Sequence, residues 1–170
     1  MYGKKSAILW GIIGGLISVI ILRELVKALL VMLILGNDMD ILFEGYTLNT
    51  VYDPVFIKSE FSRFFLLGST FLSTIIIIEI SAYILKKKND AEYKAGIIIF
   101  QLINLTWLLF GLIFFIISFA FKFSISEEWK IFFDCPLYSR HEQTLIIFLG
   151  SFVLFGYISF VLTRIKNQLK

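Results

Sequence analysis

Three ionisable side chains lie close together inside a long apolar stretch near the start of the chain. In the segment Arg23-Glu24-Leu25-Val26-Lys27, one carboxylate stands beside two cations. Arg23 and Lys27 are four apart and share one face of a helix, and Glu24, three residues before Lys27, can pair with it directly. Glu24 is then the natural clamp between the two cations. A charge within a bilayer is costly unless it is paired or reaches water. The pattern therefore predicts a buried charge cluster that faces the interior of a helical bundle.

Three further polar residues lie in later apolar runs. Glu79 brings the formal charge of the ionisable residues inside the apolar runs to zero, and it can either join the cluster or reach toward the lysines at 86–88. Gln101 and Asn104 can hydrogen-bond to neighbouring helices or line a polar cavity. We expect the first of these roles, because interhelical polar contacts are common in membrane bundles.

Membrane helices must position these residues. The chain has 170 residues, and its 58% hydrophobic and 17% charged content excludes ordinary water-soluble enzymes and disordered chains. Four apolar stretches approach or exceed the roughly 20 residues that cross a hydrocarbon core, namely 6–35, 64–85, 95–121 and 144–162. The sequence predicts one all-α integral membrane domain, 1–170, built as a bundle of four transmembrane helices.

The cations indicate how these helices are oriented. Lysines and arginines are concentrated before the first span, in the loop around 86–94 and after the last span, whereas the other two loops are acidic. The positive-inside rule then puts both termini in the cytoplasm. A net charge of +3 is too small to indicate nucleic acid. The expected partners are the lipid bilayer and either another membrane protein or a peptide.

Two local patterns add detail to this architecture. Two short β-prone runs within 39–49 meet at Glu44-Gly45, which predicts a small hairpin at the membrane surface in the first loop. In the first span, Gly11 with Gly15, and Gly14 with Ser18, form pairs of small residues four apart. Such pairs allow a neighbouring helix to approach closely.

The segment Arg23-Glu24-Leu25-Val26-Lys27-Ala28-Leu29-Leu30, followed by Gly36 and the expected hairpin, resembles the zinc-binding helix of the site-2-protease-like intramembrane metalloproteases. Those proteins carry His-Glu-x-x-His, a small residue, an apolar run ending in glycine and then a short hairpin. The stretch 63–73 is similar to the opening of the family's next helix, with Ser69 where proline is usual. The resemblance is limited to roughly residues 10–75.

Both histidines of the family pattern are replaced. A neutral imidazole binds zinc through a lone pair, whereas Arg23 offers none and Lys27 must first lose a proton. Glu24 alone remains, at the position of the general base, and the third and fourth predicted spans hold no carboxylate. The resemblance then implies a non-catalytic relative without metal or cofactor, in which two cations replace the charge of the zinc ion.

Three functions follow from this inventory. The first is a binding or interaction module with a protease-like core, and the second is a small transporter or channel subunit that uses the Arg/Glu/Lys cluster. The third, an active intramembrane hydrolase, lacks a metal set or a nucleophile with its base. Cys135 and His141 are the only residues of their types, and we expect an inert thiol and a solvated imidazole.

Overall fold

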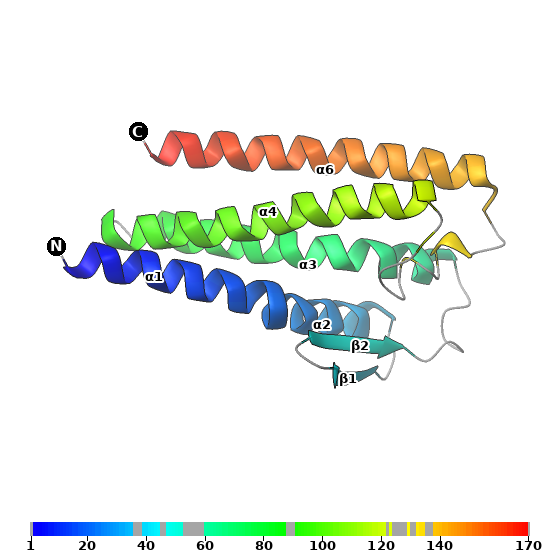
Figure 1. The fold of residues 1–170 in the computed structure, drawn as a ribbon, viewed down its shortest axis with the longest axis horizontal. Coiled ribbons are helices and arrows are strands. Elements are labelled where there is room, and N and C mark those ends of the chain that lie inside the picture. Colours follow the sequence, from blue (N-terminus) through cyan, green and yellow to red (C-terminus); the bar gives the residue numbers. More distant parts are fainter. Residues whose placement is uncertain are drawn as a thin grey trace. The chain divides into compact units, whose positions relative to one another are not determined.

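The computed structural model describes residues 2–35, 39–44, 47–52, 60–87, 91–121, 123, 129, 132–134 and 138–169. Its helices are α1 (Tyr2–Ile17), the π-helix η1 (Ser18–Leu22), α2 (Arg23–Leu35), α3 (Glu60–Lys87), α4 (Ala91–Phe121) and α6 (Arg140–Gln168) (Figure 1). The strands β1 (Met39–Glu44) and β2 (Thr47–Tyr52) pair antiparallel, with Met39 opposite Tyr52 and Glu44 opposite Thr47. The turn at Gly45 lies outside the described residues.

Three of the described helices are long and apolar enough to cross a membrane, over Phe64–Lys87, Tyr93–Phe121 and Arg140–Gln168. They coincide with the last three predicted spans, so the protein has the character of an integral membrane protein. The first predicted span is helical throughout its described length, but η1 divides it into α1 of 16 residues and α2 of 13. Each piece is shorter than the roughly 20 residues that a crossing needs, so a count of four spans stays a prediction.

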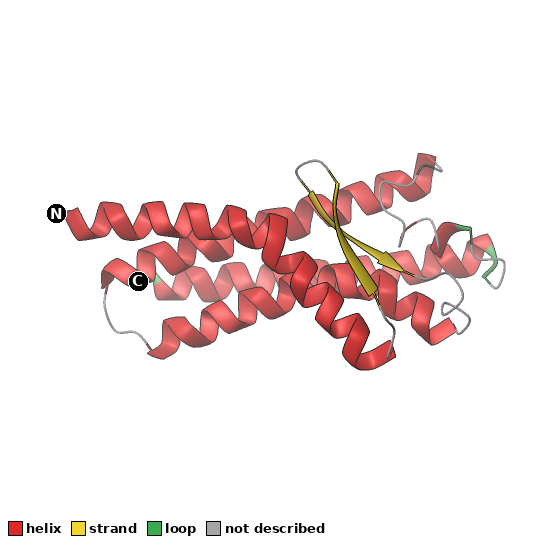
Figure 2. Ribbon diagram, turned by 90° about the horizontal axis from the view of Figure 1, so that it is seen from below, coloured by secondary structure: helices red, strands yellow, loops and turns green. Residues whose placement is uncertain are grey.

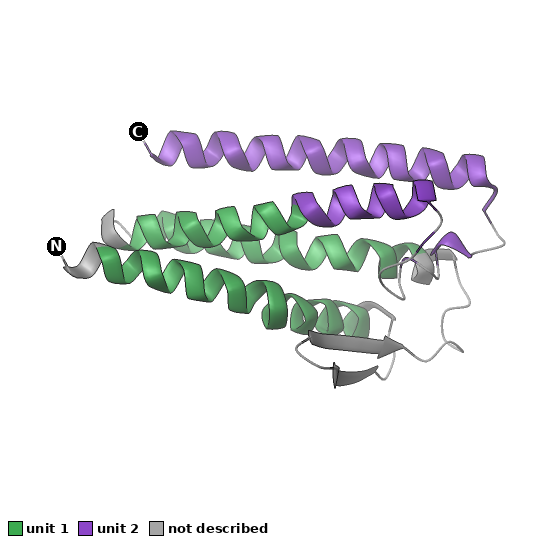
Figure 3. Ribbon diagram, viewed as in Figure 1, with its two compact units in different colours: residues 1–108 green, residues 109–170 purple. Residues whose placement is uncertain are grey.

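The chain divides into two compact units, residues 1–108 and 109–170, and α4 contributes to both (Figure 3). The first unit contains α1, η1, α2, α3 and the first part of α4. The second contains the end of α4 and all of α6. Every candidate site residue except Cys135 and His141 belongs to the first unit.

Close packing of α1 on α4 organises the first unit. A methyl group built on Gly11 would lie 2.2 Å from the carbonyl oxygen of Gly96, and one on Gly96 would lie 2.4 Å from that of Ala7. One on Gly15 would lie 2.7 Å from the side chain of Ile103. The prediction that Gly11 and Gly15 permit a close helix contact is therefore confirmed. Gly11 meets Gly96, and the later residue Gly15 meets the later residue Ile103, so α1 and α4 run parallel.

The π-helix η1 keeps the buried sides of α1 and α2 in line with each other. The amide of Arg23 bonds to the carbonyl of Ser18, five residues earlier, instead of four as in an α-helix. The buried positions follow the same step, since Val19 and Glu24 are both buried and five residues apart. Figure 2 shows the bend in the helical ribbon where α1 passes into α2. The extra residue brings the side of α1 that carries Gly15 into line with the side of α2 that carries Lys27.

The magnitude of this realignment follows from helix geometry. In an unbroken α-helix, Gly15 and Lys27 would be separated by about 120° around the axis, at about 100° per residue. A π turn accommodates about one additional residue, which reduces the separation to about 20°. The glycines that contact α4 and the buried ion pairs of α2 therefore share one side of the stretch.

In the second unit, α6 begins at a capping box. The Ser139 hydroxyl accepts from the Glu142 amide at 3.3 Å, and the Glu142 carboxylate accepts from the Ser139 amide at 2.7 Å. Inside this first turn, Gln143 is buried and donates to the carbonyls of Phe132 and Phe133 at 3.1 and 3.2 Å. The helix thus begins before the predicted boundary at 144, because Ser-x-x-Glu satisfies its first amides.

Candidate functional site: two cations on one buried carboxylate

Glu24 binds two cations at once. Its Oε1 lies 2.6 Å from Nη2 of Arg23, and its Oε2 lies 2.6 Å from Nζ of Lys27. The side chains of Glu24 and Lys27 are only 5% and 6% exposed, whereas that of Arg23 is 20% exposed. The predicted charge cluster is therefore present, and its central carboxylate is ion-paired through both oxygens.

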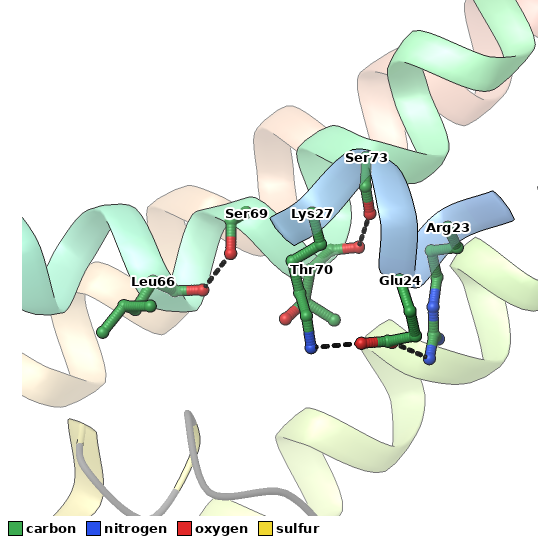
Figure 4. Close-up of polar contacts among 7 residues, drawn as sticks. All are labelled: Arg23, Glu24, Lys27, Leu66, Ser69, Thr70 and Ser73. Carbon is green, nitrogen blue, oxygen red and sulfur yellow. Dashed lines mark hydrogen bonds and ion pairs between the residues drawn. The ribbon is translucent and has the colours of Figure 1, made fainter. Parts of the chain in front are cut away.

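The cluster lies on α2, which packs against α3, and Figure 4 shows it beside the Leu66–Ser73 stretch of that helix. Two hydroxyls of this stretch are directed to their own backbone: Ser69 donates to the carbonyl of Leu66 at 2.7 Å, and Ser73 to that of Thr70 at 3.0 Å. Hydroxyls that bond three residues back satisfy themselves inside an apolar medium. The Glu24 ion pairs are polar contacts that hold Arg23 and Lys27 in place beside this stretch.

Arg23 contacts α4 as well as Glu24. Its guanidinium carbon lies 5.3 Å from the ring centroid of Trp107, a distance at which a cation is attracted to the ring face. Within the described part of the chain, its Nε is buried and has no hydrogen-bond acceptor. Arg23 is thus fixed on two sides, by a carboxylate and by an aromatic ring, and keeps a donor without a partner.

A hydrogen bond between helices lies one turn before the cluster. The Ser18 hydroxyl donates to Oδ1 of Asn104 at 2.6 Å, and Nδ2 of Asn104 donates to the carbonyl of Phe100 at 2.9 Å. Ser18 and Asn104 are both buried. Asn104 therefore connects η1 to α4, which is the interhelical role expected for it. Ser18 is also the residue whose carbonyl accepts the π-type hydrogen bond.

Gln101 behaves differently from Asn104. It is 0% exposed, yet neither its amide nitrogen nor its amide oxygen has a hydrogen-bond partner among the residues that are described. A buried amide in this state costs free energy of the order of 1–3 kcal/mol. Gln101 and Asn104 were expected to play the same role. Among the described residues, Asn104 accepts a hydrogen bond from another helix and Gln101 does not.

The remaining candidates lie in different surroundings. Glu79 is on α3 and half-buried, and its participation in the cluster stays a prediction. His141 is exposed in the first turn of α6, as expected for a solvated residue. Cys135 lies outside the described residues, so the expectation of an inert thiol is not addressed.

The side chains at positions 23 and 27 do not fit a zinc ion. Zinc needs ligand atoms with a free lone pair, and both nitrogens that face Glu24 belong to cations. In the residues that the structure covers, no three histidine, cysteine or carboxylate side chains come together in a metal-binding group. Arg23, Glu24 and Lys27 therefore have the chemistry of a salt bridge.

Sequence reasoning missed two contacts near the cluster. Ser18 was recognised only as a small residue of a packing pair, and its hydrogen bond to Asn104 was not predicted. Trp107, which contacts Arg23, carries no special pattern, because a tryptophan in an apolar run has many roles. At the start of α6, the spacing Ser139-x-x-Glu142 matches a capping box and is a signal by which the beginning of this helix can be found in the sequence.

No protein-family model matches this chain, and neither a curated protein nor a solved structure shows a significant similarity to it.

Proposed function

We propose that the chain is a non-catalytic, multi-pass membrane protein that binds another membrane protein or a peptide. The observation that carries the proposal is the state of Glu24, whose two oxygens each lie 2.6 Å from a cation. A general base must have an oxygen within hydrogen-bond reach of the proton that it abstracts. Both oxygens are engaged and positions 23 and 27 offer no zinc ligand, so Glu24 is suited to neutralising two cations inside the bundle and is poorly suited to hydrolysis.

The topology proposed with this function has four crossings and both termini in the cytoplasm. Helical residues run without a break from Tyr2 to Leu35, long enough to cross a bilayer even though η1 interrupts the α-helix. Since α1 and α4 run parallel, their first turns share one end of the first unit, which gathers Lys5 and Lys94 there. Cations gathered at one membrane face support a cytoplasmic position for that end.

The likeness to site-2-protease-like enzymes is part of the proposal and depends on the sequence around positions 23–36. In that interpretation the protein is a pseudoenzyme, in which Arg23 and Lys27 supply beside Glu24 the positive charge of a lost metal. The small hairpin formed by β1 and β2, which follows α2, would then be retained from the same ancestor.

A metal analysis tests the non-catalytic function. The purified full chain is incubated with excess zinc, dialysed and analysed for bound metal, in parallel with the double variant Arg23→His/Lys27→His. We expect far less than one zinc per wild-type chain, because the lone pairs are missing. The double variant shows whether imidazoles at these positions raise zinc uptake, and stoichiometric zinc in the wild type would overturn the proposal.

One observation favours a second function, that of a small transporter or channel subunit. The fully buried and unpartnered amide of Gln101 is what a polar path through the bundle would contain. Reconstituted vesicles loaded with a small-ion reporter distinguish the two functions. Gln101→Leu should abolish flux if the amide lines a path, and should raise stability without any flux to lose if Gln101 belongs to the core.

A further inference from the structure

We propose that Lys86 and Lys94 form a binding site for the phosphate of an anionic phospholipid at one end of the first unit. Lys86 lies in the last turn of α3 and Lys94 in the first turn of α4. The inference goes beyond the binding of a protein or peptide partner, because its ligand is a lipid of the surrounding membrane. It requires only that α3 and α4 cross the bilayer.

Both lysines lie at the level where phospholipid headgroups begin. The stretch of α3 that can cross a membrane ends at Lys87, and that of α4 begins at Tyr93. Tyr83 and Tyr93 are 59% and 57% exposed near these two ends, and exposed tyrosines are typical of the membrane–water interface. Lysines at the ends of membrane helices are within reach of lipid phosphates.

The short connection between α3 and α4 keeps their ends close together. Helix α3 ends at Lys87 and α4 begins at Ala91, so four residue steps of at most about 3.6 Å separate them. The two helix ends therefore lie within about 14 Å of each other. The flexible four-carbon stems of two lysines on such ends allow both ammonium groups to approach one ligand.

The two lysines continue the buried faces of their helices. Lys86 follows the buried residue Ala82 by four positions, and Lys94 precedes the buried residue Ile98 by four. Residues four apart share one face of a helix. Lys86 is exposed and Lys94 is half-buried, so the first is open to the headgroup region and the second lies closer to the interior of the unit.

These two cations have no anion in the described part of the chain. Neither Lys86 nor Lys94 forms an ion pair or a hydrogen bond with another described residue. Lys87 differs from them, because its Nζ lies 4.6 Å from the ring centroid of Tyr83 on its own helix and is attracted to that ring. Lys86 and Lys94 are therefore the cations of this end that are available for an external ligand.

The charge balance favours an anion from outside the chain. Residues 86–94 contain four lysines and two carboxylates, Asp90 and Glu92, so positive charge remains even where both carboxylates are paired. A lysine binds phosphate as a compact point charge, and clustered lysines at a membrane surface attract anionic lipids. The lipid phosphate is the anion that the membrane supplies at this level.

Native mass spectrometry of the full chain in a neutral detergent tests the proposal. Dioleoylphosphatidylglycerol and dioleoylphosphatidylcholine are titrated separately, because they share acyl chains and phosphate while the choline cation cancels the charge of the second lipid. We expect the first phosphatidylglycerol to bind about fivefold more tightly than the first phosphatidylcholine, which is the factor that one lysine supplies beside an anionic lipid. Equal affinities would overturn the inference, and this comparison does not depend on how well any variant folds.

Two double variants assign the preference to the site. Lys86→Gln/Lys94→Gln should lower the affinity for phosphatidylglycerol to that for phosphatidylcholine. Lys5→Gln/Lys166→Gln removes the same number of charges from exposed lysines of α1 and α6, and it should retain the preference. Equal losses in the two double variants would assign the preference to the net charge of the chain and overturn the inference. A preference that persists in Lys86→Gln/Lys94→Gln would overturn it too.

Inorganic phosphate distinguishes a lipid headgroup from a free anion. An equimolar addition of inorganic phosphate should leave phosphatidylglycerol bound, because the acyl chains contact apolar surface and the free anion does not. Displacement of the lipid would identify a site for soluble anions and overturn the inference. The zinc analysis involves neither lipid nor these lysines, so failure of this inference can be distinguished from failure of the proposed function.

Discussion

Replacing Gly11 by alanine tests the close contact between α1 and α4. The new methyl carbon would lie 2.2 Å from the carbonyl oxygen of Gly96, whereas carbon and oxygen normally approach to about 3.3 Å. Both groups are fixed by backbone, so no rotamer change relieves the overlap. The two helices must therefore separate by about 1 Å at the crossing.

The energetic cost follows from that separation. A gap of 0.5–1 Å forfeits roughly a quarter to a half of the dispersion energy between the facing atoms. In a bilayer, packing of this kind drives helix association, because lipid tails offer no hydrophobic gain. We expect Gly11→Ala to lower the free energy of unfolding by about 2 kcal/mol, within the range of overpacked cores.

The measurement is the loss of helical circular dichroism during titration of mixed micelles with dodecyl sulfate. Gly14→Ala is the matched control, because its methyl group would lie 3.6 Å from the Phe100 ring, an ordinary contact. Gly96→Ala should resemble Gly11→Ala, since its methyl group would lie 2.4 Å from the carbonyl oxygen of Ala7. The double variant should lose less than the sum of the two, because one separation relieves both overlaps. Equal stability of Gly11→Ala and Gly14→Ala would refute the reasoning.

Three further outcomes are expected. Glu24→Gln should lower the free energy of unfolding by about 3–5 kcal/mol in the same titration, because it removes the buried carboxylate that pairs with both Arg23 and Lys27; a loss below about 1 kcal/mol would show that they reach water. Deleting Ile21, which is 37% exposed in η1, should be tolerated better than deleting Ile13, 38% exposed in α1. Only the first deletion removes the extra residue of the π turn and keeps both buried faces aligned, and equal midpoints would contradict this. Ser139→Ala should destabilise the start of α6 by about 1 kcal/mol, measured by faster amide hydrogen exchange at its first turn, and unchanged exchange would show that the cap contributes nothing.

Several features could be predicted because they depend on neighbouring residues alone. Long apolar runs form helices in a bilayer, since each helix satisfies its own backbone, and α3, α4 and α6 follow that rule. The three-residue spacing of Glu24 and Lys27 was sufficient to predict their ion pair, whereas the pair of the adjacent residues Arg23 and Glu24 followed only from the neighbourhood of opposite charges in an apolar run. The pair Gly11 and Gly15 predicted a close approach, although it did not indicate the partner.

Other features depend on which helix faces which. The helix that packs on the Gly11 and Gly15 face of α1 was not predictable, because small residues mark a face for close contact without identifying the helix that covers it. The π turn is also invisible locally, since Ser-Val-Ile-Ile-Leu reads as ordinary membrane helix. Gln101 and Asn104 look equivalent in the sequence, and only the position of Ser18 makes one of them an interhelical contact.

The sequence by itself determined that this protein is built from membrane helices and that a carboxylate is held between two cations, because hydropathy and helical spacing act within a few residues. Tertiary structure decided that α1 meets α4 at glycine, that η1 turns the charged side of α2 into line with that contact, and that Arg23 rests against Trp107. These depend on distances between backbones far apart in the chain, which no local pattern of apolar residues encodes.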